Sequence, residues 1–432
     1  MTIHQNISGA NIRSKTDGLI IGMRGDVRTR PMGFVYSDLP NHSGQKAGEL
    51  VRYAGESHLM TFGVTGSGKT AGPVISNAID HPGPLICLEC KGDVYEATAE
   101  RRRQMGQHVV TLDLTGTVQH GDSFNPIDAF RRVGGDSTLI ARSIAAEIVP
   151  RGTNSEIFWL NWAETMLTGG LGCALDLAPA GQQNLGYVFD LFNNDDVVYS
   201  LAVLLDTHGS KLSRSAYSAI AGFLQLPDKE TRPSVLGSTQ QHLMLWESDL
   251  IRNLTSHTSF DLDGLINGAP ISLYIIVPPT RLKAYAPVLR LWLTGLLSAL
   301  MTRQRRPRHR TLMMCDELGA LGRIDAFVTA STLLRSAGLT LWSFWQNPSQ
   351  LEIYGSDART LVDNAGVLQF LGAKNHRMAS DFAALIGGVS ADQILEMQND
   401  EQLVMIDGNR PERMKRVRYF EHPELRGLVA SR

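Results

Sequence analysis

The segment Gly63–Thr70, GVTGSGKT, constrains this chain more than any other feature, because it matches the phosphate-binding loop G-x-x-x-x-G-K-[ST] at every position. Glycines in such a loop let backbone N–H groups turn inward around phosphates, and the helix that follows directs its positive end at the anion. An apolar run at 59–64 precedes the loop, and a helical pattern at 71–79 follows it. A strand, a tight loop and a helix in this order predict an α/β domain that binds a nucleotide.

The polar residues of the loop have expected roles in binding ATP and Mg²⁺. Lys69 is expected to reach the β- and γ-phosphate oxygens, and the Thr70 hydroxyl is expected to ligate the Mg²⁺ ion. The predicted nucleotide-binding residues are Gly63, Thr65, Gly66, Ser67, Gly68, Lys69 and Thr70.

The same glycines permit an alternative interpretation, a dinucleotide-binding dehydrogenase. Gly66, Gly68 and Ala71 also satisfy G-x-G-x-x-[GA], and Glu89 follows at about the spacing of the acid that binds the ribose in that fingerprint. This alternative gives the Lys69–Thr70 pair no function.

A second motif pairs two acids at the end of an apolar run, in the sequence TLMMCDE at 311–317. In an ATPase with a phosphate-binding loop, the first acid, here Asp316, holds the Mg²⁺ shell, and the second, Glu317, polarises the attacking water. Acids at a strand end are common, so the pair is informative only together with the loop upstream. The combination predicts ATP hydrolysis.

Short apolar runs without polar alternation recur along the chain, as expected for strands that are covered on both faces. They occupy residues 59–64, 85–90, 108–114, 271–277, 311–315, 339–344, 367–371 and 402–406. Helical patterns lie between several of these runs, so the sequence predicts an α/β fold with a parallel sheet.

The stretch from about residue 135 to 235 contains no such run and carries helical patterns at 155–178 and 212–226. We therefore expect an all-α domain, residues 136–235, inserted into an α/β domain that comprises residues 1–135 and 236–432.

The cysteine count favours a reducing compartment, because four cysteines among 432 residues do not form a disulfide framework. The longest apolar helix candidate, 286–301, is shorter than the roughly 20 residues that a bilayer requires, and it contains Arg290. The first residues contain only a six-residue apolar stretch, too short for a signal peptide. The expected location is cytoplasmic.

The order of further motifs resembles the type IV secretion coupling proteins, the TraG-like conjugative DNA-transfer ATPases. The resemblance covers about residues 32–428. Its motifs are GVTGSGKT, LICLECKGDVYEAT (85–98), SFNPID (123–128), EIFWLNWA (156–163), CDELGALGRI (315–324), WSFWQNPSQLEIYG (342–355), Gln369 with LGAKNHRMASDFAALIG (371–387), and RVRYFEHPELRGL (416–428).

This resemblance implies a RecA-like nucleotide-binding domain and a homo-hexamer that drives single-stranded DNA, bound to a relaxase, toward secretion-channel proteins. It also implies that Gln346 senses the γ-phosphate as a third catalytic residue beside Lys69 and Glu317, and that the all-α domain recognises cargo. Two departures are evident: Glu89–Cys90 replaces the family's usual Asp-Pro, and the family's two N-terminal transmembrane helices are not found. We therefore expect a soluble form that reaches the inner membrane only through partners. A nucleotide-gated receptor that selects protein effectors without moving DNA is the alternative function.

Several other residues have two interpretations. Cys87 and Cys90 form a C-x-x-C pair, but positions i and i+3 of a strand face opposite sides, so we expect two buried cysteines and no metal site. A trans-acting arginine is expected in a ring ATPase, with Arg323, Arg335 and Arg377 as candidates. Three basic clusters (102–103, 303–310 and 410–418) are either solvated surface or contacts for phosphates, lipid or a partner. The second cluster is expected at the sheet edge opposite the nucleotide.

Overall fold

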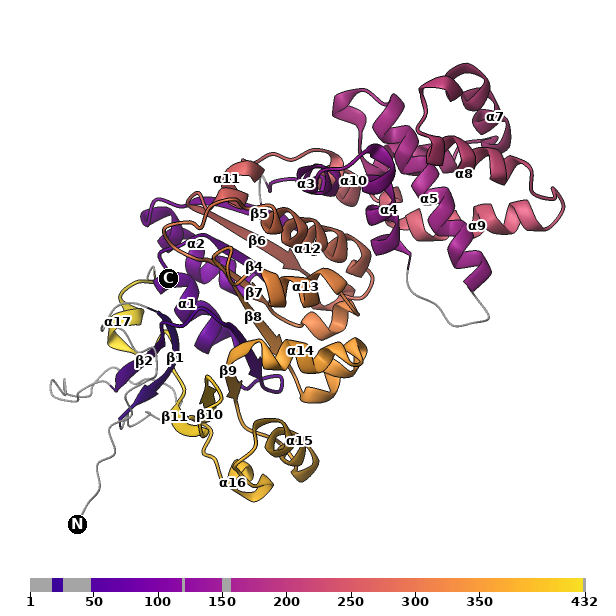
Figure 1. Cartoon of the computed structure of the whole chain (residues 1–432). Helices are drawn as coiled ribbons and strands as arrows, with labels where there is room; N and C mark the ends of the chain where they lie inside the picture. Colours follow the sequence, from indigo (N-terminus) through magenta and orange to yellow (C-terminus); the bar gives the residue numbers. More distant parts are fainter. Residues whose placement is uncertain (1–17, 26–47, 119–120, 150–156, 430–432) are drawn as a thin grey trace, which may run out of the picture.

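The computed structural model describes residues 18–25, 48–118, 121–149 and 157–429, and its centre is one sheet of 11 strands (Figure 1). The strands are β1 (Leu19–Arg24), β2 (Glu49–Tyr53), β3 (His58–Phe62), β4 (Leu85–Cys90), β5 (His108–Asp113), β6 (Ile271–Val277), β7 (Thr311–Cys315), β8 (Leu339–Trp345), β9 (Ala365–Phe370), β10 (Glu401–Ile406) and β11 (Glu412–Lys415). Their order in the sheet is β2-β1-β11-β10-β9-β3-β8-β7-β4-β6-β5.

Seven neighbouring strands, from β9 to β5 in the sheet order, are parallel. Every residue of β3, β6, β7 and β8 is buried, which explains why their sequences lack polar alternation. The predicted parallel α/β sheet is confirmed for these strands, and their carboxyl ends lie along one edge.

The other four strands extend the sheet in antiparallel fashion. The prediction that residues 402–406 belong to the parallel series is wrong, because β10 pairs antiparallel with β9. The chain between them forms α15 (His376–Ile386) and α16 (Ala391–Leu395). Strand β10 then begins beside the carboxyl end of β9 and runs in the opposite direction. Strands β1, β2 and β11 were not predicted, since short strands at the end of a sheet carry little periodic signal.

Helices cover both faces of the sheet, and each face has its own hydrophobic core. Helices α1 (Ile75–Asp80), α2 (Asp93–Gln104) and α17 (Pro423–Arg426) contribute to one core, and α12 (Ala286–Met301), α13 (Asp325–Leu333) and α14 (Asp357–Asp363) to the other (Figure 1). Helix α12 is mostly buried, as expected for an apolar core helix.

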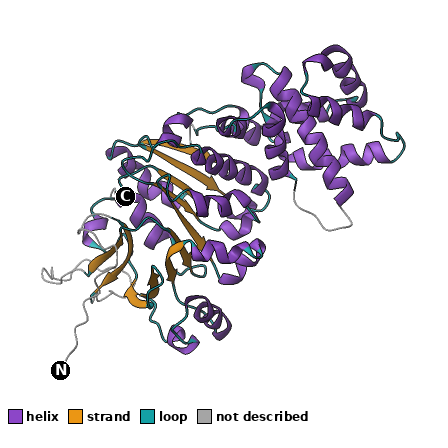
Figure 2. Ribbon diagram, in the orientation of Figure 1, coloured by secondary structure: helices purple, strands orange, loops and turns teal. Residues whose placement is uncertain are grey.

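Between β5 and β6 the described chain forms helices and loops but no strand, and its helices form a bundle beside the sheet (Figure 2). Its helices are α3 (Pro126–Val133), α4 (Ser137–Ile148), α5 (Ile157–Leu177), α6 (Leu185–Phe192), α7 (Val197–His208), α8 (Arg214–Leu224), α9 (Thr231–Leu243), α10 (Asp249–Ser256) and α11 (Leu262–Asn267). Helices α3 and α4 pack against α12, so the bundle is attached to the sheet through the core helix.

Short helical turns complete the chain. They are η1 (Thr70–Val74), η2 (Ala180–Gln182), η3 (Gly209–Lys211), η4 (Met244–Glu247), η5 (Pro279–Arg281), η6 (Leu318–Leu321) and η7 (Pro348–Tyr354). Among the described residues, no helix combines the length and the apolar character needed to cross a bilayer.

Candidate phosphate-binding and hydrolysis site

The loop Gly63–Thr70 leaves β3 at the carboxyl edge of the sheet. The Gly63 amide donates to the Trp345 carbonyl of β8 at 2.9 Å, and the Ser67 amide donates to the Val64 carbonyl at 3.0 Å. Gly66 and Gly68 adopt φ angles of 82° and 86°, which glycine reaches without strain. The glycines therefore turn the loop as the sequence motif requires.

The interior of this loop is suited to an anion. A Cβ atom placed on Gly66 or Gly68 would meet no atom within 4 Å, and the amides of these two glycines have no hydrogen-bond acceptor among the described residues. The Ser67 hydroxyl is buried and also has no hydrogen-bond partner in the described part of the chain. Free donors around open space are the arrangement in which phosphate oxygens are bound.

Lys69 is buried, and its Nζ donates to the Gly63 carbonyl at 2.5 Å across the mouth of the loop. Thr70 begins the turn η1. The helix expected over residues 71–79 is interrupted, because Gly72 is non-helical and Pro73 lacks an N–H to donate. Regular α-helix resumes only at Ile75.

Asp316 and Glu317 follow β7, two strands from the loop in the sheet. The Asp316 amide donates to the Leu88 carbonyl of β4 at 3.1 Å, which fixes the start of the turn. Burial raises the pKa of the Asp316 carboxyl to about 6; the nearby Lys69 charge lowers that pKa, and the Glu317 charge raises it. Lys69 is therefore close enough to Asp316 for their charges to interact. Glu317 has a φ of 52°, a strained conformation for a residue with a side chain.

Gln346 follows β8, between the loop strand and the acid-bearing strand. Its Nε2 donates to Glu317 Oε2 at 2.9 Å, and its backbone amide donates to Gln350 Oε1 at 2.7 Å. Gln350 therefore fixes the end of β8, where Gln346 lies. The sequence predicted no role for Gln350.

The structure thus brings the predicted catalytic and metal residues to one edge of the sheet. Thr70 and Asp316 supply a hydroxyl and a carboxylate, hard oxygen ligands of the kind that Mg²⁺ prefers when phosphate oxygens and waters complete its shell. Within the described ranges, no three His, Cys, Asp or Glu side chains gather to form a protein-only metal site. The residues present therefore fit an ion that is bound together with a phosphate.

Two other predictions concern β4. Glu89, the acid that a dehydrogenase would require, accepts hydrogen bonds from the amides of Val94 and Tyr95, both at 2.7 Å. Its carboxylate is thus used at the start of α2. Cys87 packs in the core on the α1 and α2 side, whereas Cys90 packs against the other core, so the two thiols lie on opposite faces as expected.

The three arginine candidates differ in their contacts. Arg323 binds Asp325 and Asp357 at 2.6 and 2.5 Å and also donates to the Tyr354 carbonyl at 2.7 Å. Arg335 and Arg377 are exposed, and neither side chain has a hydrogen bond or ion pair within the described part of the chain.

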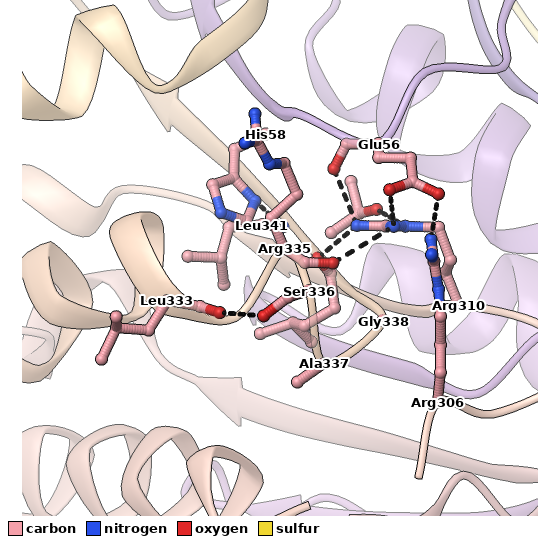
Figure 3. Close-up of polar contacts among 12 residues, drawn as sticks. Glu56, His58, Arg306, Arg310, Leu333, Arg335, Ser336, Ala337, Gly338 and Leu341 are labelled. Atoms are coloured by element: carbon pink, nitrogen blue, oxygen red, sulfur yellow. Dashed lines mark hydrogen bonds and ion pairs between the residues drawn. The ribbon is translucent and has the colours of Figure 1, made fainter.

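The basic cluster 303–310 lies at the amino edge of the parallel strands, opposite the phosphate loop, as expected. Arg310 donates to the carbonyls of Glu56 and Leu339, both at 2.7 Å, and Arg306 forms an ion pair with Glu56 (Figure 3). Arg303 is buried against the Ala337 carbonyl and the Thr311 hydroxyl. These three arginines join loops of this chain to one another. The other two arginines of the cluster, Arg305 and Arg308, are exposed and make no such contact with the described residues.

The other two clusters also contain structural arginines. Arg102 is fully buried and donates to the carbonyls of Ala78, His81 and Gly83. Arg416 donates to the Ser67 carbonyl of the phosphate loop at 2.8 Å. In the sequence, Arg416 belongs to a basic cluster and begins the motif at 416–428, but neither feature predicts a contact with the phosphate loop.

Comparison with known proteins identifies the family of this chain. Residues 3–391 match the family model described as "Type IV secretory system Conjugative DNA transfer". The protein VirD4 of Agrobacterium fabrum (strain C58 / ATCC 33970) is 23% identical over 414 residues, covering 86% of this chain and 60% of VirD4. The conjugal transfer protein TraG of Escherichia coli is 24% identical over 329 residues, covering 71% of this chain and 51% of TraG. The chain thus spans only about half to 60% of the length of these relatives.

Solved structures share the fold. The plasmid coupling protein TrwB in complex with ADP and Mg²⁺ superposes with a TM-score of 0.64 at 17% identity, covering 84% of this chain and 86% of TrwB. VirB4 of Thermoanaerobacter pseudethanolicus gives a TM-score of 0.58 at 14% identity, covering 95% of this chain and 98% of VirB4. The RecA-like α/β domain with an added helical region is therefore confirmed. Because the family model matches most of its length, this chain belongs to the type IV secretory system conjugative DNA transfer family.

Proposed function

We propose that this chain is a Mg²⁺-dependent ATPase that acts as the coupling motor of a conjugative type IV secretion system. The observation that carries the proposal is the hydrogen bond between Glu317 and Gln346. These residues follow β7 and β8, two strands that end at the same edge of the sheet as the phosphate loop. A protein that only binds nucleotide does not require a carboxylate placed to polarise water. The dehydrogenase alternative is abandoned for two reasons. The Glu89 carboxylate accepts hydrogen bonds from backbone amides at the start of α2, and the family is one of DNA-transfer proteins.

In this proposal the loop amides and Lys69 bind the phosphate chain, and Thr70 with Asp316 holds Mg²⁺. The ion, when bound, neutralises charge on the phosphate oxygens. Glu317 accepts a proton from the attacking water and holds it in line, and Gln346 orients that carboxylate while contacting the γ-phosphate. A cavity of about 450 Å³ lined by Thr65–Ser67, Lys374 and Arg416 lies on the β9 side of the loop. We assign the ribose and base to this cavity, because the opposite side of the loop faces the acids.

The assembly proposed from the family is a homo-hexamer that moves single-stranded DNA, delivered with a relaxase, into the secretion channel. The all-α region, with proposed limits at residues 136 and 235, is assigned to cargo recognition; helices in fact continue to Asn267 before β6 begins. The proposed location is the cytoplasmic face of the inner membrane, reached through secretion partners.

The test of this function is steady-state ATP turnover of the purified chain with Mg²⁺, measured with and without single-stranded DNA. Stimulation of several-fold by DNA is the result expected of the motor. Turnover that ignores DNA but responds to a secretion partner would establish the alternative, a receptor that selects protein effectors. Absence of turnover in a folded, nucleotide-bound protein would contradict the proposed ATPase.

The trans-acting arginine gives a further prediction. Because Arg323 is held by two aspartates of its own chain, we expect Arg335 or Arg377 to complete the neighbouring site. Replacing the correct one with Ala should reduce kcat by about 10³-fold with little change in nucleotide affinity. Mixing this variant with an equal amount of the Lys69→Ala variant should restore part of the activity, since each supplies what the other lacks. No restoration with either arginine variant would exclude a shared site.

The raised pKa of Asp316 predicts an unusual acid limit. A carboxyl with a pKa of about 6 loses its charge below that pH, and the protonated form does not ligate Mg²⁺. We expect kcat/KM for Mg²⁺–ATP to fall about tenfold per pH unit below pH 6, whereas an aspartate near its usual value would keep activity to about pH 4. A profile that is flat to pH 5 would contradict a pKa near 6 for a carboxylate that the reaction requires in its charged form.

A further inference from the structure

The segment Arg416–Tyr419, which follows β11, lies along the outer side of the phosphate loop. Arg416 Nη1 donates to the Ser67 carbonyl at 2.8 Å, and the Tyr419 amide donates to the Ala71 carbonyl at 3.2 Å. A Cβ on Gly72 would lie 2.9 Å from the Val417 carbonyl oxygen, so the backbones approach closely. The loop is therefore supported from outside by residues near the C-terminal end of the described chain.

Arg416 is itself held in place. Its Nε donates to the Glu401 carbonyl at 2.7 Å and its backbone amide to the Asp400 carbonyl at 2.7 Å. The pKa of the guanidinium is lowered to about 10, mainly by burial and also by the neighbouring Arg418 charge, while Asp400 acts in the opposite direction. Arg416 thus remains charged at neutral pH, and a charged donor forms a stronger hydrogen bond than a neutral one.

The consequence for the loop follows from peptide geometry. A trans peptide directs its C=O and its N–H to opposite sides, and the described chain contains no cis peptide. Arg416 holds the Ser67 carbonyl outward, so the Gly68 N–H of the same peptide faces inward. Glycine populates positive and negative φ about equally, so without Arg416 this peptide would rotate at little cost and turn its carbonyl toward the phosphates.

We propose that Arg416 is a positioning residue for nucleotide binding, whose guanidinium fixes the Ser67–Gly68 peptide so that the Gly68 N–H is presented to the phosphate chain. This role rests on the proposed ATPase function and adds to it a residue outside every nucleotide motif. Arg416 also borders the cavity assigned to the nucleoside, so its loss affects binding of ADP as well as ATP.

The test compares Arg416→Gln and Arg416→Lys with Arg413→Gln, in the full chain. Arg413 belongs to the same basic cluster and pairs with Glu401 at 3.7 Å and the Gln393 carbonyl at 3.0 Å, away from the loop. We expect Arg416→Gln to raise the KM for ATP and the Kd for ADP by about tenfold, as for loss of one charge-assisted hydrogen bond, with kcat changed less than about twofold. Arg416→Lys should fall between, because lysine keeps the charge but lacks the rigid fork of donors with which Arg416 bonds the Ser67 and Glu401 carbonyls. Arg413→Gln should match the wild type.

The outcomes separate a positioning role from a merely structural one. Equal KM and Kd in Arg416→Gln and Arg413→Gln would overturn the proposal, as would a fall in kcat together with a lowered melting temperature in the absence of nucleotide. If Arg416→Gln does not fold, Arg416→Lys decides: a raised KM at unchanged kcat supports the role, and wild-type constants refute it. Failure of the ATPase function itself would appear differently, as a wild type without turnover, while ADP binding still tests Arg416.

Discussion

Replacing Lys69 with Ala is expected to abolish ATP hydrolysis while the protein remains folded. The Lys69 ammonium is buried at the mouth of the loop, and among the described residues its one hydrogen bond goes to the Gly63 carbonyl. Losing this bond costs about 1 kcal/mol of stability, too little to unfold a domain of this size. Losing a fixed positive charge at the reacting phosphate should lower kcat by at least about 10²-fold.

The measurement is phosphate release by the purified variant, with the melting temperature as evidence of folding. Lys283→Ala is the matched control, because Lys283 is exposed between η5 and α12, far from the loop in sequence. The variant should also bind ATP more weakly and lose the charge that lowers the Asp316 pKa. Wild-type turnover in a folded Lys69→Ala protein would overturn the site assignment.

Glu317→Gln is expected to bind ATP and fail to hydrolyse it. The amide oxygen of the replacement can still accept from Gln346 Nε2, so the local geometry is kept, but an amide does not accept a proton from water. We expect kcat to fall by about 10²–10⁴-fold, with the Kd for an ATP analogue within a few-fold of the wild-type value.

A second effect makes this variant diagnostic. The Glu317 charge raises the pKa of Asp316, so removing it should move the acid limit of Mg²⁺-dependent ATP binding to lower pH. Glu352→Gln, at an exposed glutamate in η7, should change neither turnover nor this limit. Loss of ATP binding in Glu317→Gln would show instead that Glu317 is a metal ligand or a structural residue.

The parts of the site that the sequence predicted share a physical reason. The phosphate loop is a local motif, and its glycine conformations depend on adjacent residues. Asp316, Glu317 and Gln346 each follow a buried apolar strand, and carboxyl ends of neighbouring parallel strands meet at one edge. The proximity of these residues follows from strand order and direction.

The strands at the far end of the sheet were not predictable in this way. Strand β1 is held by side chains from β9 and β10: Gln369 and Gln402 both donate to the Ile21 carbonyl, at 2.7 and 2.8 Å. Asn77 of α1 pairs with both backbone groups of Ile20, at 2.8 and 2.9 Å. None of these polar residues belongs to a sequence pattern that predicts its contact with β1.

The sequence by itself determined the fold class, the strands that carry the site and the residues at their ends, because those features depend on short-range periodicity and on motifs of fixed spacing. Only the tertiary structure decided which arginines form hydrogen bonds and ion pairs within the chain, the antiparallel direction of β10, and the contact between Arg416 and Ser67. That contact joins residues 349 positions apart. A carbonyl acceptor leaves no mark on the amino-acid sequence, since every residue carries one, so such partners become visible only when the chain is folded.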